Sequence, residues 1–181
     1  MVRAEATSRP PASTDELSAT AAALWRDATH REERYAATAL MDVPTARRLQ
    51  TTALLPLYRE MITMGAWWDH VDEVSHRIGG LLLAFPSELA PILRSWAYDP
   101  DRWLRRSAVI CQIGLKQATD TELLADTIGA NLEDRDFFLR KAIGWALREY
   151  AKTDPEWVRT FVAAHELSPL SRREALKHLG A

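Results

Sequence analysis

Apolar residues recur along most of the chain at the three- and four-residue spacing of an amphipathic α-helix, and no segment alternates as a half-buried strand would. Thr14 is typical of an N-cap, and Pro56 predicts a kink in a long helix that follows Pro44 and ends at Gly65. The pattern predicts an all-α protein with helices over about 14–27, 31–41, 44–65, 67–83, 87–98, 101–117, 120–133, 136–153, 155–166 and 168–179.

A weak internal repeat indicates how these helices pack. Leu104-Arg105-Arg106 matches Leu139-Arg140-Lys141 at an offset of 35 residues, and Trp68 matches Trp103 at the same offset. Helix pairs of this period bury their apolar faces by stacking into a curved solenoid, so we expect one domain over residues 14–181. Its concave face should be formed by the helices at 67–83, 101–117, 136–153 and 168–179.

The composition adds limits to this picture. With 181 residues and 47% hydrophobic side chains, the chain can build one sizeable core. It has no apolar run of membrane-spanning length and no secretory signal, which favours a soluble cytoplasmic protein without membrane contact. Residues 1–13 contain two adjacent prolines and are expected to form a flexible tail. The single cysteine, Cys111, falls on an apolar stripe, which predicts a packing role rather than a reactive thiol.

Two stripes run along the helix predicted at 67–83. Trp67 lies on the same stripe as Val71, Val74, Ile78 and Leu82, so it is predicted to be part of the core. Trp68 and Asp72 lie on a different stripe, followed by Ser75 and Gly79, whose small side chains should leave open space above the helix. This stripe is predicted to be the floor of a groove.

A second unusual face follows the helix predicted at 136–153. Lys141, Trp145, Arg148 and Lys152 share one face, apart from the apolar stripe. A tryptophan in a row of cations favours a contact surface, although it can also pack beneath the aliphatic stems of its neighbours. The net charge of −2 means that any basic surface must come from such placement rather than from excess charge.

Arg105 and Arg106 are adjacent on the helix predicted at 101–117, so their side chains diverge by about 100°. Arg106 aligns with Lys141 in the repeat and is therefore predicted to point into the groove. Any one arginine is more often a solvated surface charge, but rows of arginine and lysine together offer donors for phosphate oxygens. Nucleic acid is the ligand that fits both the cations and the tryptophans.

Asp72 is the residue that favours chemistry over simple binding. A carboxylate repels phosphate, but it stabilises the positive charge that develops on deoxyribose when an N-glycosidic bond breaks. Tryptophan faces also attract cations. The alternative is a salt bridge from Asp72 to an arginine such as Arg106. His70 and His76 share no helical face, and no metal or cofactor is expected.

Four segments resemble the AlkD-like family of DNA alkylation repair glycosylases, which are built from HEAT-like helical repeats. They are Trp-Trp-Asp-His-Val-Asp (67–72), Trp-Leu-Arg-Arg-Ser-Ala-Val (103–109), the run 138–155 and the run 167–177. The resemblance covers the chain from about Leu24 onward. Family members usually have more helical chain before this position, so the resemblance also implies a shortened N-terminal cap.

The resemblance implies a monofunctional glycosylase that excises 3-methyladenine and 7-methylguanine from duplex DNA without flipping the lesion into a deep pocket. In that family, Trp68 and Trp145 would flank the lesion, Asp72 would stabilise the sugar cation, and Arg106 would hold the backbone. Further DNA contacts are predicted for Arg105, Lys141, Arg148 and Lys152. We expect a monomer, and the rival hypothesis is a non-catalytic helical-repeat scaffold that binds DNA or a protein.

Overall fold

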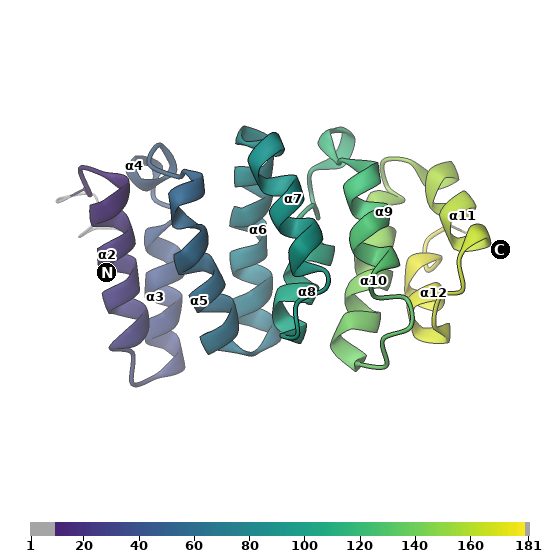
Figure 1. Cartoon of the computed structure of the whole chain (residues 1–181), viewed down its shortest axis with the longest axis horizontal. Helices are drawn as coiled ribbons and strands as arrows, with labels where there is room; N and C mark the ends of the chain where they lie inside the picture. Colours follow the sequence, from purple (N-terminus) through teal and green to yellow (C-terminus); the bar gives the residue numbers. More distant parts are fainter. Residues whose placement is uncertain (1–9, 180–181) are drawn as a thin grey trace. The chain divides into compact units, whose positions relative to one another are not determined.

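The computed structural model describes residues 10–179 and contains only helices and connecting turns over that range, which confirms the all-α prediction (Figure 1). Its contacts divide the chain after Gly65 into two compact units, which are described separately. Residues 1–9 of the tail predicted at 1–13 lie outside the described residues. Whether the chain is one HEAT-like domain stays a prediction.

The first unit contains helices that bury the apolar faces expected from the sequence. Leu17, Trp25, Tyr58 and Met61 are fully buried. The elements are α2 (Thr14–Arg26), α3 (Arg31–Leu40), α4 (Pro44–Arg47), the 3₁₀ turn η1 (Thr52–Leu54) and α5 (Leu55–Gly65).

Two predictions for the first unit were wrong in detail. The N-cap of α2 is Ser13, whose hydroxyl accepts a hydrogen bond from the Glu16 backbone N–H, and Thr14 is already helical. The long helix with a kink at Pro56 is instead three separate elements. Pro56 lies near the start of α5, where its missing N–H costs nothing because the first turn of a helix has no intrahelical acceptor.

The second unit consists of helices arranged in two layers. Contacts join α6 to α8, α8 to α10 and α10 to α12 in one layer, and α7 to α9 in the other. In Figure 1, α7 and α9 lie in front of α8 and α10. The first layer contains the four helices predicted to form the inner face. The helices are α6 (Trp68–Ala84), α7 (Pro86–Trp96), α8 (Arg102–Ile110), α9 (Thr121–Gly129), α10 (Phe137–Tyr150), α11 (Pro155–Ala164) and α12 (Pro169–Ala175).

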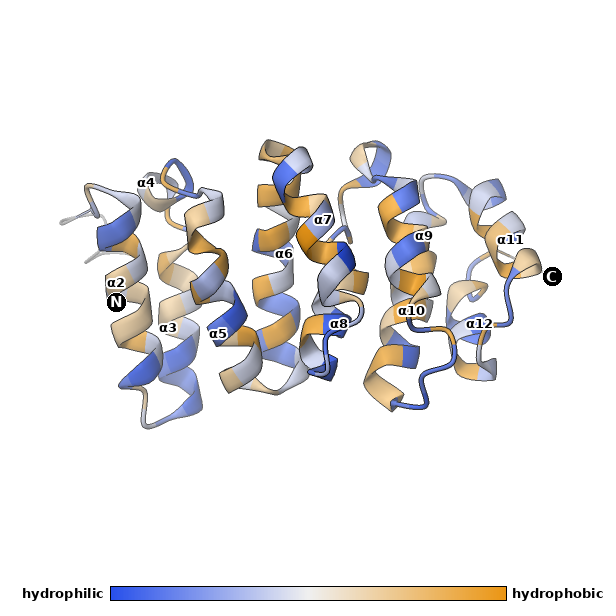
Figure 2. Cartoon of the chain, in the orientation of Figure 1, coloured by the Kyte–Doolittle hydropathy of each residue, from blue (hydrophilic) through white to orange (hydrophobic). Residues whose placement is uncertain are grey.

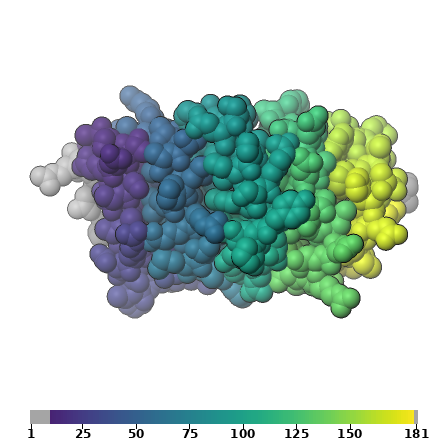
Figure 3. Space-filling model, in the orientation of Figure 1, coloured from purple at the N-terminus to yellow at the C-terminus, as the bar shows by residue number. Residues whose placement is uncertain are grey.

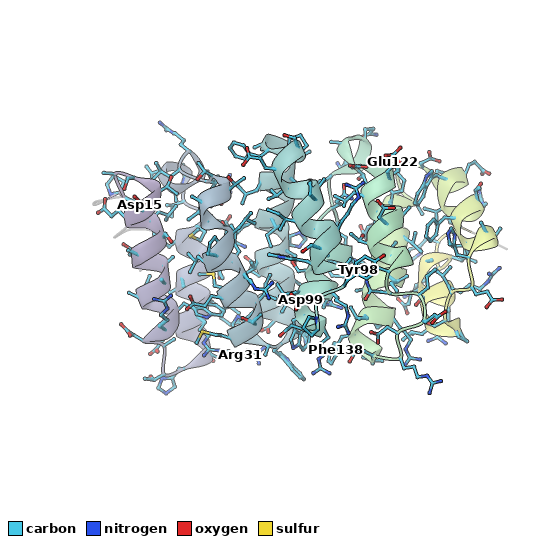
Figure 4. All side chains as sticks on the ribbon, in the orientation of Figure 1. Asp15, Arg31, Tyr98, Asp99, Glu122 and Phe138 are labelled. Atoms are coloured by element: carbon cyan, nitrogen blue, oxygen red, sulfur yellow. The ribbon has the colours of Figure 1, made fainter. Side chains whose placement is uncertain are left out.

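Aspartate caps begin two alternate helices of this unit, α8 and α10, at the same place in the repeat. The side chain of Asp101 accepts hydrogen bonds from the first backbone N–H groups of α8, and Asp136 does the same for α10. Figure 4 shows Asp99 and Phe138 at one end of these helices and Glu122, which follows the Asp120 cap of α9, at the other end. The second unit therefore alternates in direction as stacked helical hairpins.

The end of α8 differs from the prediction of a helix to about residue 117. The helix stops at Ile110, and the chain then turns through Gly114, with φ of 91°, and Lys116, with φ of 54°. Backbone in this left-handed region cannot continue a right-handed helix. Leu115, which the periodicity placed on the α8 stripe with Cys111, is therefore in a turn.

A continuous hydrophobic core joins the layers of the second unit. Its apolar side chains come from α8, α9, α10, α11 and α12, including Val109, Ile128, Ile143 and Val162. Figure 2 shows hydrophobic and hydrophilic residues sharing each of these helices, as an amphipathic pattern requires. In the space-filling view, side chains fill the spaces that the ribbons leave between neighbouring helices of this unit (Figure 3).

The small residues of α6 serve this packing and do not leave open space, so that prediction was wrong. Ser75 is buried, and its hydroxyl donates to the Ser107 hydroxyl of α8 at 2.9 Å. A Cβ placed on Gly79 would lie 2.1 Å from the carbonyl oxygen of Cys111. Both residues let α8 approach the α6 backbone closely.

Candidate functional site

Asp72 and Arg106 form a two-pronged salt bridge between α6 and α8. Arg106 Nε donates to Asp72 Oδ1 and Arg106 Nη2 donates to Asp72 Oδ2, both at 2.7 Å. The side chains are only 13% and 6% exposed, respectively. The salt bridge that the sequence left open as an alternative for Asp72 is therefore present in the structure.

Arg106 also reaches the next helix of the layer. Its Nη1 donates to the backbone carbonyl of Phe138 in α10 at 2.7 Å, so one buried guanidinium joins α6, α8 and α10. The prediction that Arg106 points into an open groove is wrong in this geometry, because its donors face protein acceptors. What Arg106 does here is fix the plane of the Asp72 carboxylate.

Trp68 is the first residue of α6, one turn before Asp72, and its side chain is 47% exposed. The indole ring is therefore accessible, and the prediction that Trp68 and Asp72 together line a groove stays a prediction. Trp67 was predicted to be core, but it is the N-cap residue of α6 and is 43% exposed. Because Trp67 is not in helical conformation, the helical stripe that placed it with the valines does not extend to it.

Trp67 instead joins a cluster of rings at the starts of α6, α8 and α10. Its ring centroid lies 5.6 Å from that of Phe138 and 6.4 Å from that of Trp103, and the latter two are 5.0 Å apart. The Arg102 guanidinium carbon lies 4.9 Å from the centre of the Trp103 ring. The sequence reasoning missed this cluster, although the Trp68–Trp103 repeat offset had marked one of its members.

Trp145 is half-buried in α10 and packs against the hydrophobic core of the second unit. Part of the ring packs on the core and part remains accessible, and the role of the accessible part as a contact surface stays a prediction. Lys141 precedes it by one turn and Arg148 follows it by nearly one turn, so all three share a face of α10.

The predicted DNA-binding cations are paired with acceptors of the protein. Lys152 lies in the turn just beyond the end of α10, so the prediction that it is part of the helix was wrong, and its Nζ lies 2.6 Å from Glu149. Arg105 bonds Asp134 and the backbone carbonyl of Asp99. Lys141 and Arg148 share one acceptor, Glu174. These cations are consequently not a row of open donors in the unliganded protein.

Glu174 of α12 was missed at the level of sequence. Its Oε1 lies 3.1 Å from Lys141 Nζ and its Oε2 accepts from Arg148 Nη1 at 2.5 Å. The Lys141 ammonium and, after it, the Arg148 guanidinium hold the pKa of this carboxyl below its usual value, against the opposing effect of burial. Nothing in the local sequence marks Glu174, because its partners lie 33 and 26 residues earlier.

A pocket of about 360 Å³ lies at the C-terminal ends of α8 and α10. Gln112, Lys116, Tyr150 and Lys152 are among its lining residues. Of the predicted site residues only Lys152 borders it. The pocket is therefore separate from the surface around Trp68 and Asp72, and its shape does not identify the site.

The second unit is a stack of helical hairpins, and it carries an exposed tryptophan one turn from an arginine-bound carboxylate. These features define the class of the protein as a helical-repeat protein with an aromatic and acidic site. The chain belongs to the DNA alkylation repair enzyme family, whose model matches residues 2–179. The membership confirms the resemblance drawn from the four sequence segments, and it supports an enzyme that acts on DNA in alkylation repair.

A solved structure described as a predicted DNA alkylation repair enzyme from Enterococcus faecalis is similar to this chain. The two share 31% sequence identity and superpose with a TM-score of 0.84, over 98% of this chain and 81% of the other. No curated protein matches the chain significantly. Among residues 10–179, none of the helices combines the length and the apolar character needed to cross a membrane.

Proposed function

We propose that this protein is a DNA glycosylase that releases N3- and N7-alkylated purines, such as 3-methyladenine and 7-methylguanine, from duplex DNA. The observation that carries the proposal is the Asp72 carboxylate, held by two N–H groups of Arg106, one helical turn from the exposed ring of Trp68. Family membership supports DNA as the substrate.

The reaction proceeds by loss of the base from deoxyribose. The bond between C1′ and the purine nitrogen breaks, and its electron pair neutralises the positive charge of the alkylated purine. Water then adds to C1′ and loses a proton to solvent, which leaves an abasic site. Positive charge on the sugar peaks between these events, and a fixed carboxylate with nearby indole faces stabilises it.

Arg106 leaves Asp72 able to play this role. A carboxylate offers about four acceptor positions, and the guanidinium occupies one on each oxygen. Because the carboxylate is already oriented before substrate binds, little reorganisation is needed when charge develops. We assign Asp72, Trp68 and Trp145 to the reacting sugar and base, and Arg106 to positioning Asp72.

A non-catalytic scaffold is the second candidate. The observation in its favour is that Arg105, Lys141, Arg148 and Lys152 all bond acceptors of the protein, so the surface is less open to DNA than the sequence predicted. The two candidates differ in whether any base is released.

The test is incubation with an oligonucleotide duplex that contains one 7-methylguanine, followed by alkaline cleavage of abasic sites. The proposal expects strand cleavage at the lesion, and single-turnover release slower by roughly 10- to 1,000-fold in Asp72→Asn. Duplex binding without any release by the wild-type protein would support the scaffold instead.

A further inference from the structure

The carboxylate of Glu174 pairs with Lys141 and Arg148, the two cations of α10 that lie nearest to Trp145. Its two oxygens are divided between them, with Oε1 at 3.1 Å from Lys141 Nζ and Oε2 at 2.5 Å from Arg148 Nη1. The Glu174 side chain is only 14% exposed, whereas that of Lys141 is 40% exposed. The carboxylate is thus held inward while one of its cations still faces solvent.

Close packing of α12 against α10 fixes the position of Glu174. A Cβ on Gly144 would lie 2.5 Å from Glu174 Cβ and 2.9 Å from the Ser171 carbonyl oxygen, so only glycine permits the approach. The Ser171 hydroxyl donates to the Arg140 carbonyl at 2.9 Å and fixes the register of the two helices. Glu174 therefore lies over the part of α10 from which Trp145 also projects.

The arrangement has the charge pattern of a phosphate clamp with a carboxylate in place of the phosphate. A lysine and an arginine that converge on one anion are the side chains that contact DNA phosphates most strongly. Here the anion belongs to the protein, so the trio carries a net charge of about +1 instead of +2. A DNA phosphate must displace Glu174 before it can bond both cations.

We propose that Glu174 is a specificity-determining residue that competes with backbone phosphate for Lys141 and Arg148 and so weakens binding to undamaged DNA. The inference rests on the proposed action on duplex DNA and adds a residue to it. Binding at a lesion must offset the lost pairing of Glu174 with Lys141 and Arg148. Undamaged DNA lacks the cationic purine and therefore offers less binding energy to offset that loss.

Comparison of Glu174 with a second acid, Glu149, distinguishes competition with phosphate from a general effect of surface charge. Glu149 pairs with another predicted DNA-binding cation, Lys152, but the two are three residues apart and the Lys152 side chain is 61% exposed. An exposed pair of this kind contributes little and gives way easily to other partners. Glu149→Gln removes the same charge as Glu174→Gln and is the control.

The experiment measures the affinity of the full chain for an undamaged duplex at several salt concentrations. Glu174→Gln should steepen the log–log salt slope by about 1 to 2, because up to two more phosphate contacts release counterions. Its gain in affinity over the wild-type protein should therefore shrink by about 4- to 16-fold between about 50 and 200 mM salt. Glu149→Gln should change the slope far less.

Unchanged or weaker binding by folded Glu174→Gln, with folding checked by circular dichroism, would overturn the inference. Should that variant fail to fold, Glu174→Asp tests the same point, since a carboxylate one methylene shorter holds Lys141 and Arg148 less closely and should also steepen the slope. An unchanged slope in folded Glu174→Asp would likewise overturn the inference.

Undamaged duplex involves no chemistry, so the outcome is independent of glycosylase activity. A steeper slope in Glu174→Gln together with no base release in any assay would leave Glu174 as a competitor for phosphate and would remove the proposed reaction. Base release with an unchanged slope would support the proposed reaction and would remove Glu174 as a competitor for phosphate.

Discussion

Asp72 and Arg106 constrain each other more than an exposed acid and base would. Arg106 has its Nε, Nη1 and Nη2 groups bonded to protein acceptors and is nearly inaccessible. Replacing either member alone leaves a poorly solvated charge, which is costly to folding. Any change in activity must therefore be separated from a change in stability.

For Arg106 we expect Arg106→Gln to lower the single-turnover rate of base release by about 100-fold, because the Asp72 carboxylate loses its orientation. The free energy of unfolding should fall by about 3 kcal/mol, and Asp72→Asn/Arg106→Gln should recover most of that loss without recovering activity. Since Arg106 makes no phosphate contact in this geometry, the salt slope of duplex binding should not change. A slope shallower by about 0.9 would mean that Arg106 does reach the backbone.

The two neighbouring tryptophans should respond differently to truncation. Trp68 makes no ring or hydrogen-bond contact within residues 10–179, so Trp68→Ala should slow base release and change the melting temperature little. Trp67→Ala removes two ring contacts and should cost about 1–3 kcal/mol, less than a full core deletion. Thermal melts and excision rates on both variants check this. A larger stability loss in Trp68→Ala than in Trp67→Ala would contradict the assignment.

Cys111 illustrates a residue whose environment suppresses its chemistry. It is fully buried, its thiol donates to the Ala108 carbonyl, and burial raises its pKa to about 12. The thiolate is the reactive form, so iodoacetamide at pH 8 should leave the folded protein unlabelled and should label it rapidly in urea. Mass spectrometry measures both. Rapid labelling of the native protein would show that this part of α8 opens readily.

Among the elements of the second unit, glycine and serine decide how closely α6 approaches α8 and how closely α10 approaches α12. α6 meets α8 at Ser75 and Gly79, and α10 meets α12 at Gly144 and Ser171. Close approach of the backbones brings Asp72 within reach of Arg106 and Glu174 within reach of Lys141. The site thus depends on packing positions that are not themselves among the proposed site residues.

Adjacent glycines in α6 provide a direct test of this dependence. A Cβ on Gly79 would collide with the Cys111 carbonyl at 2.1 Å, whereas a Cβ on Gly80 has nothing within 4 Å. Gly79→Ala should therefore cost about 1–3 kcal/mol, while Gly80→Ala should stabilise the protein by about 0.5–1 kcal/mol through higher helix propensity. Denaturant unfolding compares the two. Equal effects at both positions would contradict the close contact between α6 and α8.

Most helices could be predicted from hydrophobic periodicity, which reports on which face is buried, and the grouping of α6, α8, α10 and α12 in one layer could be predicted from the repeat. Predictions failed where a rule outside periodicity decides the conformation. Trp67 is an N-cap, which the helical wheel does not describe, and α8 ends early because Gly114 and Lys116 adopt left-handed backbone. Ser75 and Gly79 were misread because a small side chain fits both an open groove and a tight contact.

Pairings between residues that are distant in the sequence set a different limit on what the sequence can predict about the site. The charged residues were found as helix faces, but a face does not reveal its partner on another helix. Arg106 bonds Asp72, 34 residues earlier, and Lys141 pairs with Glu174, 33 residues later. Such spacings follow from the repeat of about 35 residues, so the repeat offset was the one signal that could have suggested them. Glu174 had no counterpart in the repeated segments and could not be found this way.

Over the second unit as a whole, charge is placed to hold helices together more than to attract DNA. Most of its arginines and lysines bond a carboxylate or a carbonyl, as Arg94 does with Asp126 and Arg102 does with Asp136. Some exposed cations of this unit have side chains without an ion pair or hydrogen bond in the described part of the chain. They are Lys116, Arg135, Arg173 and Lys177. These residues, and not the predicted row on α10, are free to meet phosphate without breaking an interaction within the protein.

Of these free cations, Arg173 and Lys177 flank Glu174 in the sequence, and Lys116 borders the separate pocket. If DNA lies over the Lys141–Arg148 surface, Arg173→Gln and Lys177→Gln should each make the salt slope of undamaged duplex binding shallower by about 0.9, the effect of removing one phosphate contact. Lys116→Gln changes the net charge equally and should leave the slope unchanged, because a cation that lies away from the DNA displaces none of its counterions. Fluorescence anisotropy titrations at four salt concentrations measure all three slopes. An equal effect from Lys116→Gln would mean that the charge of the whole molecule, and not its placement around Glu174, governs how this protein meets DNA.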